Sequence, residues 1–291
     1  MISVELTKLL RRPRTWISIV LLCALPVGVA VFIAVTHLAP PPGQGSAFLS
    51  AVLQDGSLYP AAALALVLPV FLPVAVALVA GDSIAGEATG GTLRYLLIRP
   101  VGRTRLLIAK LVGVLTFVLL AVVAVTVTSY ITGVLCFGSS PPAAVGGGGG
   151  GQPGLPTSGV QAGASVTSLS GPALTLTQLI ERIIGAIALI TVSMLGVAAI
   201  AIFLSTVTDS VMGAAFGALA VLVGSEVLVT LNAASAVQPY LPTRYWLDWV
   251  DFFRQPIFWR DIQRGFGIQL LYVAIFLAMA WANFSTKDVT A

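Results

Sequence analysis

One carboxylate, Glu226, lies well inside an apolar run, between residues 211 and 231. An ionisable group is costly in hydrocarbon, so such groups usually face the interior of a helix bundle or a wet cavity and often mark a transport path. Glu226 is therefore a candidate for a translocation pathway. A second interpretation stays open, because the residue lies toward one end of its run and could reach water or pair with an external arginine.

An aromatic and charged segment, residues 240–264, follows this run. It places Trp246 and Trp249 among arginines and aspartates, a mixture typical of a membrane–water interface. The segment could form a re-entrant or surface-lying helix pair that gates the outer end of a path, which makes both tryptophans pathway candidates. It could equally be an ordinary aromatic belt.

Groups that catalyse reactions or bind metals are scarce. The one histidine, His37, has no second His, Cys or carboxylate at ligand spacing, and Cys23 and Cys136 do not form a metal or disulfide pattern. The phosphate-binding pattern GxxxxGK[ST] is absent, and the glycine run 146–151 has no lysine or hydroxyl placed to hold phosphate. We therefore expect no catalytic residue, no metal site and no cofactor in this chain.

Hydrophobicity defines the class of protein. Charged residues make up 9% of the chain, whereas soluble domains contain about 25%, and the mean hydropathy is +1.00. Six apolar runs are long enough to cross a hydrocarbon layer of about 30 Å. This pattern predicts an all-α, polytopic membrane protein with a single transmembrane domain, whose expected spans are residues 16–38, 59–80, 106–137, 179–205, 211–231 and 265–281.

Two features should interrupt this layout. Pro69 and Pro73 predict a kink in the second span, because each removes a backbone hydrogen bond. Residues 139–171 are dominated by Gly, Pro, Ser and Ala, a composition that predicts a flexible loop between the third and fourth spans.

Basic residues are distributed unevenly about the spans. Six spans place both termini on one side, which then holds 10 of the 15 lysines and arginines, while the other side holds 5. Cytoplasmic flanks are the basic ones, so we expect a multi-pass protein of the inner (plasma) membrane with both termini cytoplasmic and residues 139–171 outside. The basic residues form no continuous stripe with aromatics, which argues against nucleic acid as a partner.

The N-terminal residues also have a helical pattern. Ile2, Leu6, Leu9 and Leu10 recur at helical spacing, with charged residues between them. This pattern predicts an interfacial helix that lies in the headgroup region with its basic side toward anionic lipid. A basic flank that only fixes the orientation of the chain is the alternative.

The loop at residues 81–105 predicts two short helices. Asp82 or Ser83 can cap the first, the glycines ending at Gly91 can terminate it, and Pro100 terminates the second. Two short helices within a polar loop suggest a docking surface for another protein.

A pattern of residues between positions 87 and 110, in this loop and just after it, is specific enough to compare with known families. Its residues are Glu87, Gly91, Thr92, Leu93, Leu96, Leu97, Arg99, Pro100, Val101, Arg103 and Lys110. The run resembles the signature of the permease subunits of ABC-2-type ATP-binding-cassette transporters. The six-span layout, the basic N-terminal helix and the end of the last span extend the similarity across the chain, whereas residues 139–171 are not part of the pattern.

The resemblance implies a coupling helix, Asp82 to Gly91, that inserts into a cleft of a separate ATPase with Glu87 as the foremost polar contact. The residues expected to couple are Asp82, Ser83, Ile84, Glu87, Gly91, Thr92, Leu93, Arg99, Pro100 and Arg103. It also implies two ABC ATPase subunits, which hold ATP and Mg²⁺, and a second permease copy or a relative, in a homo- or heterodimer. The activity implied is export, with helices outside the membrane gating the path.

Two other function classes remain as alternatives. A secondary transporter or channel should show several ionisable groups within the membrane, of which Glu226 alone is evident, and would not need a docking loop. A membrane-embedded lipid-modifying enzyme should show convergent His, Asp or Glu side chains at one membrane face, and the sequence offers few.

Overall fold

The computed structural model describes residues 2–36, 56–89, 103–138, 165–167, 173–231, 235–254 and 256–286. In chain order the elements are α1 (Ile2–Arg11), α2 (Pro13–Thr36), η1 (Gly56–Leu58), α4 (Tyr59–Val67), α5 (Phe71–Gly81), α6 (Ala85–Thr89), α8 (Arg103–Phe137), β1 (Ser165–Thr167), β2 (Ala173–Thr175), α9 (Leu176–Val207), α10 (Val211–Thr230), η3 (Gln238–Tyr240), η4 (Asp248–Phe253) and α11 (Trp259–Thr286).

Five of these helices, α2, α8, α9, α10 and α11, are long and apolar enough to cross a membrane. The pair α4 and α5 passes the same test together but is bent by 59° at a short break, so the number of spans is six if the pair is one span. The predicted kink at Pro69 and Pro73 is thereby confirmed, since Pro69 lies in the break and Pro73 in the first turn of α5, and neither can donate the backbone hydrogen bond of a continuous helix. The chain is a helical membrane protein.

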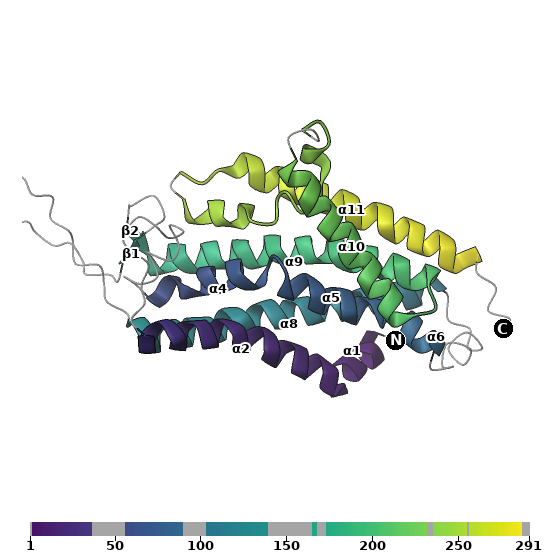
Figure 1. The fold of residues 1–291 in the computed structure, drawn as a ribbon, viewed down its shortest axis with the longest axis horizontal. Coiled ribbons are helices and arrows are strands. Elements are labelled where there is room, and N and C mark those ends of the chain that lie inside the picture. The colour runs from purple at the N-terminus through teal and green to yellow at the C-terminus, as the bar shows by residue number, and fades with distance from the viewer. Residues whose placement is uncertain are drawn as a thin grey trace, which may run out of the picture.

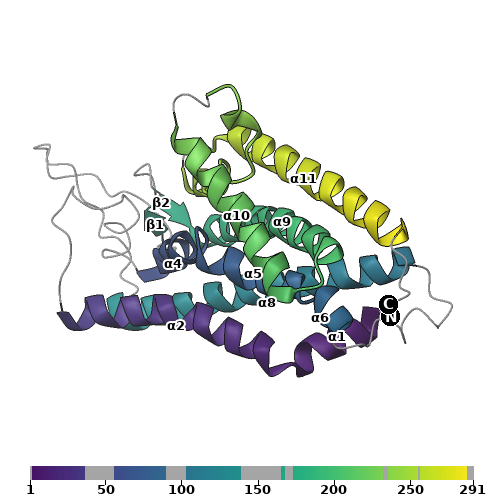
Figure 2. The ribbon, with the colours of Figure 1, turned by 45° about the vertical axis from the view of Figure 1, so that its right-hand side comes forward.

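Helix α9 forms the centre of the bundle. It contacts α5, α8, α10 and α11, and in two views it runs between α8 and α11 (Figure 1 and Figure 2). Its fully buried residues include several alanines, among them Ala186, Ala198 and Ala201. Small side chains let neighbouring helices approach closely, and this packing drives helix association where the surrounding lipid is as apolar as the helices themselves.

Helices α2 and α11 lie at opposite edges of the bundle (Figure 1). Only 22% of the most apolar stretch of α2, and 17% of that of α11, is buried within the chain. Their exposed side chains are large and apolar, for example Leu21 and Phe32 on α2 and Leu270 and Ile275 on α11. A surface of this kind is unfavourable in water and suits contact with hydrocarbon.

The two ends of the bundle differ in what they contain. One end holds α1, α6, the start of α8 and the last turn of α11, and we call it the α6 end (Figure 1). The opposite end holds β1 and β2, which pair antiparallel with Ser165 opposite Thr175, and we call it the β end. The termini of the described chain, in α1 and α11, thus lie at the same end.

Several boundaries differ from those expected. The last helix begins at Trp259 and ends at Thr286 instead of covering 265–281, because the polar residues at both ends continue the helical backbone. Strand β1 lies within the segment expected as a loop and pairs with β2 in a short ribbon, but the described chain is otherwise helical, which agrees with the all-α prediction. The rest of residues 139–171, and His37, lie outside the described residues.

The start of η1 touches α8 through two glycines. A Cβ atom added to Gly133 would lie 2.3 Å from the carbonyl oxygen of Gly56 and 2.5 Å from the Cβ atom of Tyr59. The backbone N–H of Gly56 also donates to the carbonyl of Gly138, at 3.2 Å. Two backbones can approach this closely only where neither residue carries a side chain.

We expect Gly133→Ala to destabilise the protein by up to about 2 kcal/mol. Alanine favours a helix over glycine by about 1 kcal/mol, but the forced overlap with Gly56 costs about 1–3 kcal/mol as in other overpacked sites. Thermal unfolding of the detergent-solubilised protein measures the difference. Gly28→Ala on α2 is the matched control, since its Cβ would meet no atom within 4 Å; equal shifts for both variants would contradict the packing argument.

Candidate functional site

Glu87, on the short helix α6, is the centre of a buried ion-pair network. Its side chain is 3% exposed, and its Oε1 accepts hydrogen bonds from Lys8 of α1 and from Lys110 of α8, the latter at 2.5 Å. The Lys110 side chain is itself 4% exposed. One carboxylate thus joins three helices that are well separated in the sequence.

Two further ion pairs extend this network toward α2. The Lys110 ammonium lies 3.2 Å from both carboxylate oxygens of Glu5, and the Arg12 guanidinium donates to Asp82 at 2.6 Å. We call the six side chains the charge cluster: Glu5, Lys8, Arg12, Asp82, Glu87 and Lys110. It contains three acids and three bases, so its formal charges balance.

The lysines decide the protonation state of Glu87. Burial raises the pKa of its carboxyl group, but the charge of Lys110 and the hydrogen bonds from Lys110 and Lys8 outweigh burial, so the net pKa is lower than usual. Glu87 is therefore ionised at neutral pH. A lowered pKa stabilises the folded state at pH values above the ordinary carboxyl range, and this contribution is lost as the pH falls through the lowered pKa.

A serine on the central helix holds the turn that leads into α6. The Ser205 hydroxyl donates to the carbonyl of Gly81 at 2.7 Å and accepts from the backbone N–H groups of Ala85 at 2.8 Å and Ile84 at 3.3 Å. The end of α5 also packs directly on α10, because a Cβ on Gly81 would lie only 3.2 Å from the backbone nitrogen of Ala215. Helix α6 is thereby connected to α9 and α10 as well as to α1 and α8.

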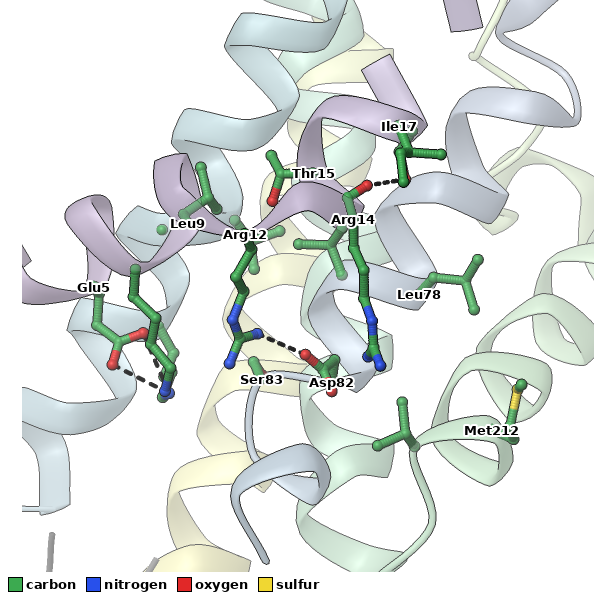
Figure 3. A pocket seen from close by; sticks show the side chains of 17 residues that line it. Glu5, Leu9, Arg12, Arg14, Thr15, Ile17, Leu78, Asp82, Ser83 and Met212 are labelled. Atoms are coloured by element: carbon green, nitrogen blue, oxygen red, sulfur yellow. Dashed lines mark hydrogen bonds and ion pairs between the residues drawn. The ribbon is translucent and has the colours of Figure 1, made fainter. Parts of the chain in front are cut away.

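A cavity of about 360 Å³ opens beside the charge cluster, between α1, α2, α5, α8 and α10. Figure 3 shows Arg12 reaching Asp82 across it, with the Arg14 side chain extended alongside. One wall carries the charge cluster except Glu87, and the other is apolar, with Ile17, Leu78 and Met212 among its residues.

The structure brings together part of the predicted coupling site. Asp82, Ser83, Ile84 and Glu87 lie together at the α6 end, but the expected helix from Asp82 is wrong at its start, since residues 82–84 form a turn and α6 begins at Ala85. Arg103 is the first residue of α8. The other expected coupling residues, Gly91, Thr92, Leu93, Arg99 and Pro100, lie outside the described residues.

Glu87 differs most from its expected role. The family resemblance implies a polar contact for a partner, whereas the carboxylate is buried beside lysines 79 and 23 residues away along the chain. Sequence reasoning missed Lys8 and Lys110 as its partners, and Ser205 as the residue that hydrogen-bonds the turn before α6. One signal was present, because Lys110 follows an apolar stretch that starts at Leu106, and a buried ammonium there requires an acidic partner.

The predicted pathway residues do not lie together. Glu226 is exposed on the surface of α10, while the neighbouring Ser225 is buried and hydrogen-bonds with Thr243 at 2.8 Å. Trp246 and Trp249 are 6% and 0% exposed. Both tryptophans are therefore buried within the described part of the chain, and their place beside a translocation path stays a prediction.

The segment around η4 packs against the first half of α9. The Phe252 ring lies where a Cβ on Gly185 of α9 would come within 3.1 Å of it, so the glycine makes room for the aromatic side chain. Trp249 meets Phe253 edge to face, with centroids 6.1 Å apart. Gln269 of α11 supports the segment from its other side by donating to the carbonyl of Pro242 at 2.6 Å.

Asp248, the first residue of η4, is poorly compensated. Burial raises the pKa of its carboxyl group to about 6, and the charges of Asp251 and Asp261 add to the shift while Arg244 opposes it. Its Oδ2 atom is buried without a hydrogen-bond partner among the described residues. Protonation of Asp248 therefore favours the folded state.

A family match covers most of the chain. The family described as "Protein of unknown function (DUF2705)" matches residues 27–290. The chain belongs to the DUF2705 family. The match includes Asp82, Glu87 and Lys110 of the charge cluster, whereas Glu5, Lys8 and Arg12 precede it. No curated protein matches the sequence. Within the described part of this DUF2705 protein, no group of three His, Cys, Asp or Glu side chains could hold a metal ion.

We expect Glu87→Gln to lower the free energy of unfolding of this DUF2705 protein by about 3 kcal/mol, because the change leaves the buried Lys110 without half of its counter-charge. Thermal and denaturant unfolding in detergent measure the loss. Glu181→Gln on the exposed start of α9 is the control and should change stability by less than about 0.5 kcal/mol. In a double-mutant cycle with Lys110→Met, additive losses would contradict direct coupling of the two side chains.

We expect Asp248→Asn to change how the stability of the DUF2705 protein depends on pH. Between the ordinary carboxyl pKa and about 6, the folded state binds more protons at Asp248 than the unfolded state, so the stability of the natural protein falls as pH rises through this window. Unfolding temperatures measured from pH 4 to 7 should show this fall to be smaller in the variant. An identical pH profile for both proteins would show that Asp248 does not titrate in this range.

Proposed function

We propose that this protein is the membrane-spanning permease subunit of an ATP-binding-cassette transporter, an exporter, driven by separate ATPase subunits that dock at the α6 end. The observation that carries the proposal is the set of buried contacts that join α6 to the bundle: Glu87 to Lys8 and Lys110, and Ser205 to the turn before α6. The sequence resemblance of residues 87–110 to ABC-2-type permeases supplies the class of transporter.

These contacts suit the transmission of movement. A coupling element must be rigid and must press on several spans at once, so that a small displacement at a partner becomes a rearrangement of packed helices. Helix α6 is connected to α8 through Lys110, to α9 through Ser205, and to α10 through the close approach at Gly81. In this mechanism Glu87 does not itself touch the ATPase but transfers the displacement of α6 to α1 and α8.

The proposed assembly places ATP and Mg²⁺ in two partner ATPase chains. The α6 end is then cytoplasmic, which puts both termini in the cytoplasm and the β end outside a plasma membrane. Helix α1 lies in the cytoplasmic interface, with exposed Ile2, Val4 and Leu10 in the headgroup region.

A second permease copy, or a relative, completes the transport path. Glu226 is exposed on α10 in the single subunit, so a path between two subunits can include it, whereas a path through the centre of one subunit cannot. In this arrangement Trp246 and Trp249 do not line the path themselves. They are buried and hold the η4 segment in place against α9.

The test uses an exposed residue of α6 that lies outside the charge cluster. Thr89 ends α6 and is exposed, so Thr89→Arg should weaken binding of a candidate ATPase at least about tenfold, equivalent to about 1.4 kcal/mol, by obstructing the docked surface. Glu87→Gln should retain binding but lose most of the cargo-stimulated ATP hydrolysis. Binding is measured by co-purification and by adding the ATPase to inverted and right-side-out vesicles.

Thr230→Arg is the matched control, since Thr230 is exposed at the far end of α10, and it should leave binding unchanged. Binding of the ATPase only to inverted vesicles agrees with a cytoplasmic α6 end. The proposal fails if no ATPase associates with the natural protein, or if Thr89→Arg and Thr230→Arg bind it equally well.

A further inference from the structure

The cavity beside the charge cluster contains one positive charge that the cluster does not neutralise. Lys8, Arg12 and Lys110 each pair with an acid of the cluster. Arg14 also lines the cavity, and the described residues provide no ion pair or hydrogen bond to its guanidinium. Figure 3 shows its side chain extended into the cavity past Leu78, beside Asp82. The Asp82 carboxylate already pairs with Arg12. The guanidinium of Arg14 therefore leaves the cavity with one excess positive charge.

The rest of the cavity is apolar and lies along the spans. Its lining includes Ile17 of α2, Val79 of α5, Val114 of α8 and Met212 of α10. Gly113 is buried in the wall, yet a Cβ added to it would meet no atom within 4 Å, which places it against open space. The ligand that fits must therefore combine an anionic group with a hydrocarbon segment.

The position of Arg14 along the first span also fits a ligand with an anionic group and a hydrocarbon segment. It is the second residue of α2, at the start of a span that runs from Pro13 to Thr36. Arginine side chains at the end of a span lie at the level of lipid headgroups. The planar guanidinium can donate two parallel hydrogen bonds to a phosphate, which makes arginine the preferred residue for such contacts.

We propose that this cavity binds one anionic phospholipid, with the headgroup phosphate on Arg14 and an acyl chain along the apolar wall toward Gly113. The bound lipid completes the charge balance at the α6 end and fills the space between α2 and α10. The site does not depend on the proposed transport function, since a permease, a channel or an enzyme could hold a lipid in this way.

The experiment measures lipid binding to the full-length protein in detergent, by native mass spectrometry and by the shift in unfolding temperature on adding lipid. Phosphatidylglycerol should bind and stabilise the natural protein, and phosphatidylcholine should bind much more weakly. Arg14→Gln should weaken phosphatidylglycerol binding at least about tenfold, because a charge-assisted hydrogen bond is lost. Arg11→Gln, at an exposed arginine outside the cavity, is the matched control and should bind as the natural protein does.

A second pair of variants tests the apolar half without changing any charge. Gly113→Leu fills the cavity and should also weaken phosphatidylglycerol binding about tenfold, while Gly28→Leu, which likewise meets no atom at Cβ, should not. Inorganic phosphate is the third ligand tested. The proposal is overturned if Arg14→Gln binds lipid as well as Arg11→Gln, if Gly113→Leu leaves binding unchanged, or if inorganic phosphate stabilises the protein as much as phosphatidylglycerol does.

Discussion

A buried carboxylate is tolerated only when positive charge meets it, and Glu87 imposes this requirement on the whole α6 end. Its two lysine partners come from α1 and α8, and Lys110 in turn holds Glu5. Glu87 and Lys110 are both buried, so removing either one leaves the other without part of its compensation, at a cost of about 3–5 kcal/mol. These contacts hold α6 against α1 and α8, and α6, only five residues long, owes its position to them more than to its own helical propensity.

The remainder of the bundle is held by a different kind of interaction. Around α9 the contacts are apolar and close, with Ala198 and Ala201 completely buried, and the surrounding lipid offers them no hydrophobic driving force. Shape decides the arrangement there, as at the Gly56–Gly133 approach. Charge decides the arrangement at the α6 end, where water and headgroups can solvate whatever the protein leaves unpaired.

The sequence predicted those features that depend on local composition. Apolar runs of sufficient length indicated the spans, and Pro69 and Pro73 indicated the bend, because both properties are read within about twenty residues. Partners distant in the chain could not be predicted, such as Lys8 and Glu87, 79 residues apart. Trp246 and Trp249 were ambiguous for another reason, since an aromatic residue suits a membrane interface and a packed interior equally well. Only the tertiary contacts of Trp249 show that it lies in the interior.

The long separation between Glu5 and Lys110, 105 residues, has a consequence for biogenesis. The chain is synthesised from its N-terminus, so α1 exists before either α6 or α8 has left the ribosome. During that interval Glu5 and Lys8 of α1 lack the charged partners that they meet in the folded protein, while α2, α4 and α5 are already made. Helix α1 is therefore made well before α6 and α8, and it reaches its final neighbours only after Lys110 has been synthesised.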